Sequence, residues 1–197
     1  MSTQPYSNDF FTCYDQKTTN ETENFMKCLV NLLSDPELNF KEWQHGKNYS
    51  CSVAEIAKIW QTKKLGFHIE ILNPKSFSCP YHKHHEEEEL FIILKGSGTV
   101  RQDDEFYKVK EGDLVFFKTG VAHQFYNHTD APMLFFALSN QSNNEVCIYP
   151  DSNKMLMRDG KNRVITQNGL EIDDYFRDEE DPGIKWPKHI LQGETSK

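Results

Sequence analysis

Short apolar segments separated by turn residues follow one another from residue 65 to residue 149, and this pattern constrains the fold most strongly. The segments with strand character cover residues 67–72, 76–82, 88–94, 98–102, 105–110, 113–117, 122–127, 133–139 and 146–149. Turn-forming pairs such as Asn73-Pro74 and Glu111-Gly112 lie between them. Strands at this spacing, without helices between them, predict an all-β sandwich or barrel.

Two of these segments are apolar on both faces of the expected strand. They are residues 91–94 and residues 134–138. A strand with apolar residues on both faces is typically covered on both sides. We therefore expect these segments either in a barrel wall or against a second subunit, and the chain is predicted to form a homodimer.

Imidazoles and carboxylates are concentrated in residues 82–89, which read His-Lys-His-His-Glu-Glu-Glu-Glu. Side chains two apart in a strand share a face, so His82 and His84 are expected to point the same way. A carboxylate must come from the next strand, which Glu89 begins, and a third imidazole, His123, follows the turn at Gly120. Three imidazoles and one carboxylate suit one divalent Fe, Mn, Ni, Cu or Zn ion and leave coordination positions open.

Each part of this pattern has an ordinary explanation when it is taken alone. The charged run at residues 82–89 has the composition of a solvated loop. Taken alone, His123 is equally well explained as a core histidine whose hydrogen bonds are satisfied. The combination of the two parts, in order and at fixed spacing, is what favours a metal centre.

The combination resembles the two motifs of the cupin superfamily. The first motif is His-x-His, three or four residues, Glu, six residues and Gly, and it is matched by His82, His84, Glu89 and Gly96. The second is Gly, five residues, Pro-x-Gly, two residues, His, three residues and Asn, and it is matched by Gly112, Gly120, His123 and Asn127. The chain departs from the motifs at Lys118, where the family usually has Pro, and at Ser76, where a Gly is expected.

The resemblance implies a cupin double-stranded β-helix, or jelly-roll barrel, with His82, His84, Glu89 and His123 as metal ligands. Glu88 remains an alternative to Glu89, because the family tolerates a gap of three or four residues. Gly96, Gly112, Gly120 and Asn127 take structural positions. His68 on an early strand is either a cavity residue or a histidine at the rim, and Arg101 either touches a ligand or belongs to the wall.

The chain resembles small single-domain cupins that generally have no assigned reaction, and cupins with this ligand set include dioxygenases, isomerases and decarboxylases. The resemblance therefore implies a protein that binds or acts on a small organic metabolite, with a dioxygenase-like oxidoreductase favoured. A non-catalytic module that binds a sugar-like molecule is one alternative. A sugar-phosphate isomerase is another, although it needs cations for the phosphate and few Lys or Arg residues lie near the motifs.

The rest of the chain divides into an N-terminal extension, residues 1–64, and a C-terminal arm, residues 151–197, on either side of a barrel at residues 65–150. Helical patterns are predicted over residues 23–34 and 52–63, with a strand as the alternative for the second segment, while residues 37–51 are expected to be irregular. The arm is polar without a clear period, so it is predicted to be irregular, packed on the barrel or partly disordered. It is compatible with a lid over the barrel or with a passive surface arm.

Composition excludes several classes of partner. The 197 residues suit one domain, and a net charge of −8 without a basic cluster argues against nucleic acid or an anionic membrane as partner. No apolar run reaches the ~20 residues of a membrane helix, and the first 12 residues lack the apolar core of a secretory signal. Five Cys residues without a Cys-x-x-Cys pair predict reduced thiols and a cytoplasmic protein.

Overall fold

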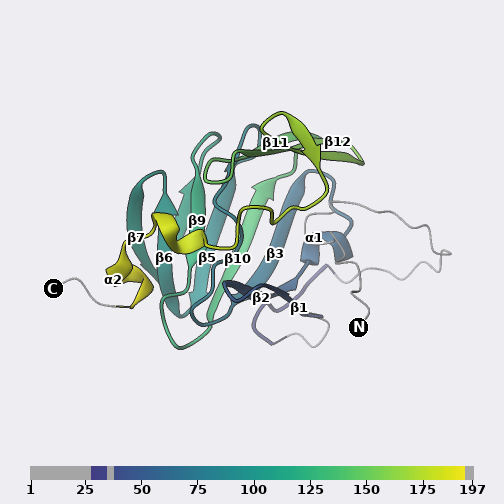
Figure 1. Ribbon diagram of the computed structural model, residues 1–197. Coiled ribbons are helices and arrows are strands. Elements are labelled where there is room, and N and C mark those ends of the chain that lie inside the picture. The colour runs from purple at the N-terminus through teal and green to yellow at the C-terminus, as the bar shows by residue number, and fades with distance from the viewer. Residues whose placement is uncertain (1–27, 35–37, 194–197) are drawn as a thin grey trace, which may run out of the picture.

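The computed structural model describes residues 28–34 and 38–193, and these residues fold mainly into β-strands arranged in three sheets (Figure 1). The largest sheet has the order β1-β2-β3-β10-β5-β8, and a three-stranded sheet has the order β7-β6-β9. Their strands are β1 Lys41–His45, β2 Tyr49–Ala54, β3 Leu65–Leu72, β5 Glu89–Lys95, β6 Ser97–Gln102, β7 Glu105–Lys110, β8 Leu114–Phe117, β9 His123–Tyr126 and β10 Met133–Asn140. The all-β fold class predicted from the strand pattern is confirmed.

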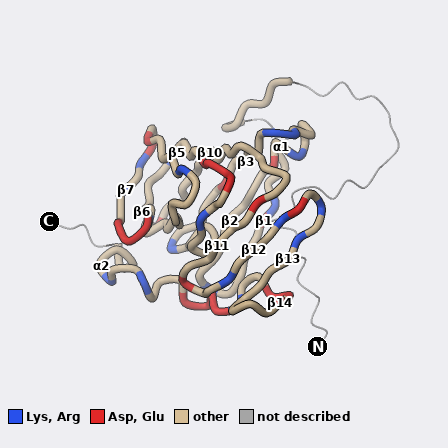
Figure 2. Tube along the Cα trace, turned by 90° about the horizontal axis from the view of Figure 1, so that it is seen from above, with Lys and Arg blue, Asp and Glu red and all other residues tan. Residues whose placement is uncertain are grey.

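A third sheet has the order β14-β13-β12-β11-β4, and Figure 2 shows its strands β11 to β14 in the view from above. Its strands are β4 Lys83–His84, β11 Asn144–Tyr149, β12 Lys154–Asp159, β13 Asn162–Gln167 and β14 Leu170–Ile172. The short helices are α1 Ile56–Ile59, the 3-10 helix η2 Pro182–Lys185 and α2 Lys188–Leu191. Among the described residues, no helix is long and apolar enough to cross a bilayer.

The barrel interior is filled by alternate residues of the facing strands. On β5, Phe91 and Ile93 point inward, and on β10 Met133, Phe135 and Ala137 do the same. The other face of these strands is only half-buried within one chain. On the adjoining β8, the outward residues Leu114 and Phe116 are 66% and 56% exposed. The two-sided apolar segments therefore have one face in the barrel core, and on the other face Leu94 and Leu134 pack against a second cluster of Ala54, Ile56 and Ile69.

The N-terminal part differs from the prediction. Residues 28–34 form turns rather than a helix, and residues 23–27 lie outside the described residues. Residues 37–51 were expected to be irregular, but most of them form a hairpin of β1 and β2 that turns at Gly46. The second predicted helix, residues 52–63, is reduced to the four residues of α1 in the structure. Ser52 pairs with Ile71 of β3 instead of capping a helix. Pairing between distant strands has outweighed the local helix signal.

The predicted strand at residues 76–82 forms only isolated bridges, at Phe77 and His82. Pro80 lies in its middle and has no N–H group to donate, which prevents a continuous ladder. Regular pairing starts with the short strand β4, which meets Cys147 and Ile148 of β11. Residues 76–82, which end at His82, therefore form a loop that the bridges at Phe77 and His82 hold in place.

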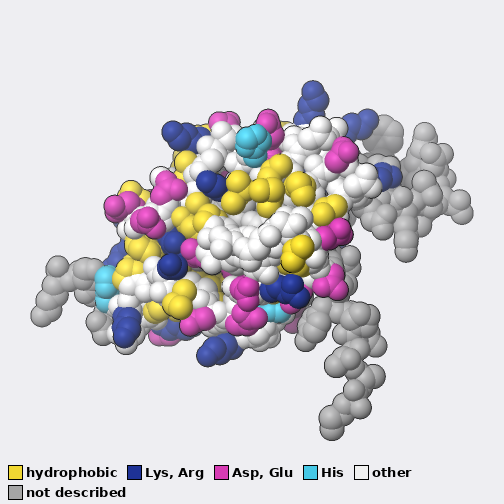
Figure 3. Space-filling view, turned by 45° about the horizontal axis from the view of Figure 1, so that its top comes forward, with side chains coloured by type: hydrophobic (Ala, Val, Ile, Leu, Met, Phe, Trp, Pro, Cys, Tyr) yellow, Lys and Arg dark blue, Asp and Glu magenta, His cyan; other side chains and the backbone are white. Residues whose placement is uncertain are grey.

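The expectation of an irregular C-terminal arm is wrong, because residues 154–172 form β12, β13 and β14. After them, Trp186 is buried against Tyr49, Phe77 and Tyr126, and its Nε1 donates to Gln124 Oε1 at 3.0 Å. On the face seen in Figure 3, Lys and Arg side chains are interspersed with Asp and Glu side chains. The C-terminal segment is an integral layer of the folded chain.

Candidate metal centre

The four residues of the predicted ligand set come from three segments of the fold: the chain that enters β4, the start of β5 and the start of β9. His82 and His123 face each other across a backbone bridge, in which each N–H donates to the other residue's carbonyl oxygen, at 3.2 and 2.8 Å. His84 lies on β4, and Glu89 begins β5. Two-residue spacing directs His82 and His84 to the same side, as the strand period requires.

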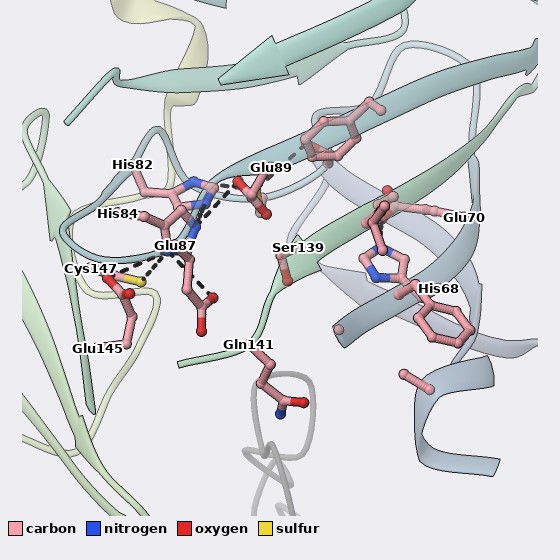
Figure 4. A pocket seen from close by; sticks show the side chains of 18 of the residues that line it. His68, Glu70, His82, His84, Glu87, Glu89, Ser139, Gln141, Glu145 and Cys147 are labelled. Atoms are coloured by element: carbon pink, nitrogen blue, oxygen red, sulfur yellow. Dashed lines mark hydrogen bonds and ion pairs between the residues drawn. The ribbon is translucent and has the colours of Figure 1, made fainter. Parts of the chain in front are cut away.

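The ligand atoms of these four side chains converge on one point, where all lie within 4.8 Å of one another. His82 Nε2 and His84 Nε2 are 3.1 Å apart, and Glu89 Oε2 lies 3.3 Å from His84 Nε2. His123 Nε2 lies 2.8 Å from the same carboxylate oxygen. Figure 4 shows His82, His84 and Glu89 pointing toward one another.

Hydrogen bonds at the other ring nitrogens orient the imidazoles. His82 Nδ1 lies 2.9 Å from the Pro80 carbonyl oxygen, and His123 Nδ1 lies 3.2 Å from that of Val121. A carbonyl oxygen only accepts, so the proton of each ring belongs on Nδ1 and the lone pair is left on Nε2. Metal-bound histidines are usually fixed in this way by a partner on the second nitrogen.

Two atoms at the convergence point have no hydrogen-bond partner. They are Glu89 Oε2 and His123 Nε2, both buried, and their 2.8 Å approach lacks the angle of a hydrogen bond. Buried polar atoms without partners are costly. A cation at the convergence point would satisfy both atoms, and it would also accept the Nε2 lone pair of His82. The residues present therefore fit a divalent metal ion.

The ionisable side chains of the cluster have pKa values that are shifted in different directions. Burial lowers the pKa of His82 well below its ordinary value, and the nearby His123 and His84 lower it further. Burial alone would lower the pKa of His84, but the charge of Glu89 and hydrogen bonds raise it well above the ordinary value. Burial would raise the pKa of Glu89, but the positive charge of His84 and the proximity of His123 hold it well below its ordinary value. Without a metal, His84 and Glu89 thus form an ion pair.

The surroundings hold this geometry in place. Phe117 stacks on the His123 ring with centroids 3.9 Å apart and planes 5° apart. Asn127, fully buried, donates to the carbonyl oxygens of Leu72 and Ala131. Gly96 has φ +83°, and a Cβ there would lie 2.8 Å from the Pro132 oxygen. At Gly112 and Gly120 the positive φ alone favours glycine, since a Cβ would meet no atom within 4 Å.

The remaining acidic residues of the run have other environments. Glu88 is exposed, and its N–H donates to Asn140 Oδ1 at 2.6 Å. Glu87 is buried and pairs with Arg158 at 2.5 Å. Arg101 pairs with Asp151 and lies over the Tyr81 ring. Of the adjacent carboxylates, Glu89 is the one that the structure brings to the three imidazoles.

Comparison with known proteins agrees with this geometry. Residues 68–139 match the family model of the cupin domain. An uncharacterized protein of Aquifex aeolicus is 31% identical over 112 residues, which cover 56% of this chain and 89% of that protein. The chain belongs to the cupin superfamily. An uncharacterized protein of Methanocaldococcus jannaschii is 30% identical over 70 residues, and the match spans 36% of this cupin and 56% of that protein.

Solved structures show the same fold. A protein from Acidithiobacillus ferrooxidans has a TM-score of 0.64 at 22% identity, covering 71% of this cupin and 91% of that chain. A sugar phosphate isomerase from a cupin superfamily, from Silicibacter pomeroyi, has a TM-score of 0.59 at 25% identity. That match covers 62% of this cupin and 80% of the isomerase.

The four candidate ligands line a cavity of about 230 Å³ inside the cupin barrel. Phe91, Phe125 and Phe135 supply part of its apolar wall. His68 and Glu70 line the same pocket, and Figure 4 shows them at some distance from the histidine cluster. A pocket below the usual size for drug-like ligands suits a small metabolite.

Two arginines in the wall, Arg158 on β12 and Arg163 on β13, were missed by the sequence reasoning. Both lie in the segment that was predicted to be an irregular arm, about 70 residues after the first motif. The sequence gives little signal for them, because Met155, Leu156 and Met157 are consecutive apolar residues and show no alternation of apolar and polar side chains. The pocket thus contains cations that counting Lys and Arg near the motifs did not find.

Proposed function

We propose that this cupin binds one divalent transition metal ion per chain, Fe, Mn, Ni, Cu or Zn, through His82, His84, Glu89 and His123. The observation that supports the proposal is the pair of buried, unpartnered atoms, Glu89 Oε2 and His123 Nε2, at the point where the four side chains converge. Three nitrogens and one oxygen form a donor set of intermediate softness, which is compatible with these metals.

We further propose that the protein is a metal-dependent enzyme that acts on a small organic metabolite, with a dioxygenase-like oxidation as the leading reaction class. When bound, such an ion acts as a Lewis acid toward an oxygen of the metabolite or as the site where dioxygen binds. The chain's own residues orient the metabolite, and Phe91, Phe125 and Phe135 exclude water beside the ligand cluster. This aromatic wall is the feature that favours oxygen chemistry.

A sugar-phosphate isomerase is the second candidate. Arg158 and Arg163 line the pocket, and arginine is well suited to binding phosphate. The Silicibacter pomeroyi structure, a sugar phosphate isomerase, provides fold-level support. Against this candidate, Arg158 already pairs with Glu87 and donates to the Ser142 carbonyl oxygen at 2.7 Å, so a phosphate must compete with both.

A non-catalytic module that binds a sugar-like molecule is the third possibility, and one set of measurements separates the three. Elemental analysis of the purified protein is expected to show one transition metal ion per chain. Dioxygen uptake with a metabolite pool, and nitric oxide perturbing the spectrum of the Fe(II)-loaded protein, would support the oxygenase. Interconversion of an aldose phosphate and a ketose phosphate would support the isomerase. Tight ligand binding that survives metal removal would support the binding module.

We propose a cytoplasmic location for this cupin. The support is that the cysteines in the described part, Cys28, Cys51, Cys79 and Cys147, are free thiols, two of them buried. Fractionation of cells that express a tagged copy tests the location. Recovery of the protein outside the cytoplasm would contradict it.

A further inference from the structure

The pocket that contains the metal-ligand cluster has a second polar end, formed by His68 and Glu70 on β3. Both side chains are turned into the barrel, where Figure 4 shows them beyond Ser139 as seen from the cluster. Glu70 is 4% exposed, which makes it one of the most buried carboxylates of the chain. No residue of the two cupin motifs lies at this end.

The Glu70 carboxylate is poorly satisfied by the protein. Oε1 is buried without a hydrogen-bond partner, and Oε2 lies 3.7 Å from His68 Nε2, beyond hydrogen-bond distance. The Cys51 thiol, a weak donor, also interacts with the Glu70 side chain through a hydrogen bond. Burial raises the pKa of Cys51, and the charge of Glu70 raises it further. Glu70 therefore has an oxygen available for a donor that the described protein does not supply.

The cations that line the pocket are engaged elsewhere. Lys58 pairs with Glu55, Arg158 pairs with Glu87, and the Arg163 guanidinium lies over the Tyr175 ring. One basic side chain, His68, lies 3.7 Å from Glu70 Oε2, but it is 37% exposed and carries a charge only when it is protonated. A buried carboxylate without a close, permanently charged partner is costly, and a ligand with a cationic group can compensate for it. Glu70 thus has the properties of a recognition residue rather than of a structural one.

We propose that Glu70 receives the protonated amine of a ligand whose opposite end, a carboxylate, reaches the metal-ligand cluster. The inference rests on the proposed function for the carboxylate end alone, because the amine end is recognised by Glu70 whether or not a metal is bound. β10 lies between β3 and β5 and pairs with Glu70 at Phe135 and with Glu89 at Ser139, so the two glutamate backbones are about 10 Å apart across the sheet and roughly 13 Å apart along it. The two side chains and the metal cover part of this span, and the ligand must cover the rest. The ligand class is therefore a short ω-amino carboxylate, a chain with charged groups at both ends.

Isothermal titration of the Zn-loaded protein with 4-aminobutanoate, 5-aminopentanoate and 6-aminohexanoate tests the proposal. Each compound is compared with the carboxylate of the same length and with its ω-hydroxy analogue. At least one amino carboxylate is expected to bind roughly tenfold or more tightly than both analogues, as a charged hydrogen bond predicts. Glu70→Gln should abolish this preference and leave the binding of the plain carboxylate and the Zn content unchanged.

Glu55→Gln is the matched control, because Glu55 also lines the pocket but is paired with Lys58. It should retain the preference for the amine. Glu70→Gln should melt at the same temperature as the wild type or higher, since it removes an uncompensated buried charge. A purely structural Glu70 would make the variant less stable, so the melting temperature separates the two roles.

Titration of the chelator-treated protein with n-butylammonium separates failure of this proposal from failure of the metal centre. Binding to the wild type that is lost in Glu70→Gln supports the amine site even if the protein takes up no metal. The proposal is overturned if the wild type does not discriminate amino carboxylates from their hydroxy analogues. It is equally overturned if Glu70→Gln discriminates as well as Glu55→Gln does.

Discussion

Replacing Lys154 with Met should destabilise this cupin strongly, because the lysine joins the C-terminal segment to the third sheet. Lys154 is 1% exposed. Its Nζ donates to the carbonyl oxygens of Tyr175 and Arg177 at 2.6 and 2.8 Å, and it lies 2.9 Å from Glu179 Oε1. Glu179, also buried, would retain only the bond from Ser152 Oγ at 2.6 Å.

The expected loss follows from the uncompensated carboxylate. Removing one partner of a buried ion pair costs about 3–5 kcal/mol. For a chain of this size that corresponds to a fall in melting temperature of roughly 6–20 °C. Urea unfolding followed by circular dichroism measures the free energy of unfolding directly. Lys161→Met, at an exposed lysine in the turn between β12 and β13, is the matched control and should change it little.

A double variant tests the reasoning further. Burial lowers the pKa of Lys154 despite the attraction of Glu179, and burial raises the pKa of Glu179 despite Lys154. Both shifts favour the neutral forms, so the cost of desolvation exceeds the attraction within the pair. Lys154→Met combined with Glu179→Met should therefore recover most of the stability. A Lys154→Met variant within about 1 kcal/mol of Lys161→Met would refute the account.

Three further predictions concern the site, the pH dependence and the assembly. Glu89→Gln and His123→Ala should each lose metal affinity by roughly 100-fold or more while the barrel stays folded, and wild-type metal content in both would disprove the ligand assignment. The folded-state pKa of Glu179 is raised above its ordinary 4.5, so the folded state binds this proton more tightly. Stability relative to Glu179→Gln should therefore fall as pH rises from about 4.5 through the raised pKa, and denaturant titrations at several pH values would show an opposite slope if the sign is wrong. We propose that a second copy covers the apolar outer face of β8, so Leu114→Glu with Phe116→Lys should convert a dimer to a monomer in sedimentation. A wild-type monomer at high concentration would remove this argument.

Much of the barrel could be predicted from the sequence because its strands follow a simple period. Residues 105–110 coincide with β7, and most other predicted segments differ from the observed strands by one or two residues. The two-residue period also predicts that His82 and His84 share a side, and the structure places both in the cluster with Glu89 and His123. Local spacing is sufficient for such features, because side-chain direction in a strand depends on the backbone alone.

The C-terminal sheet could not be predicted, because its burial pattern reverses the usual one. On β12, Lys154 is buried while Met155 and Met157 are partly exposed. Polar residues at buried positions remove the alternation by which strands are recognised. Only the folded chain shows that distant carbonyl oxygens and Glu179 compensate for Lys154.

The sequence by itself determined the strand order of the barrel segment, the cupin motifs and the residues able to meet at one metal ion. The tertiary structure decided which other groups line the same pocket. Glu70 and Arg158 lie on β3 and β12, strands outside the two motifs, and they line the pocket because the barrel and the third sheet bring these strands together. Burial of a charged side chain depends on partners that are remote along the chain, so no local pattern reveals it.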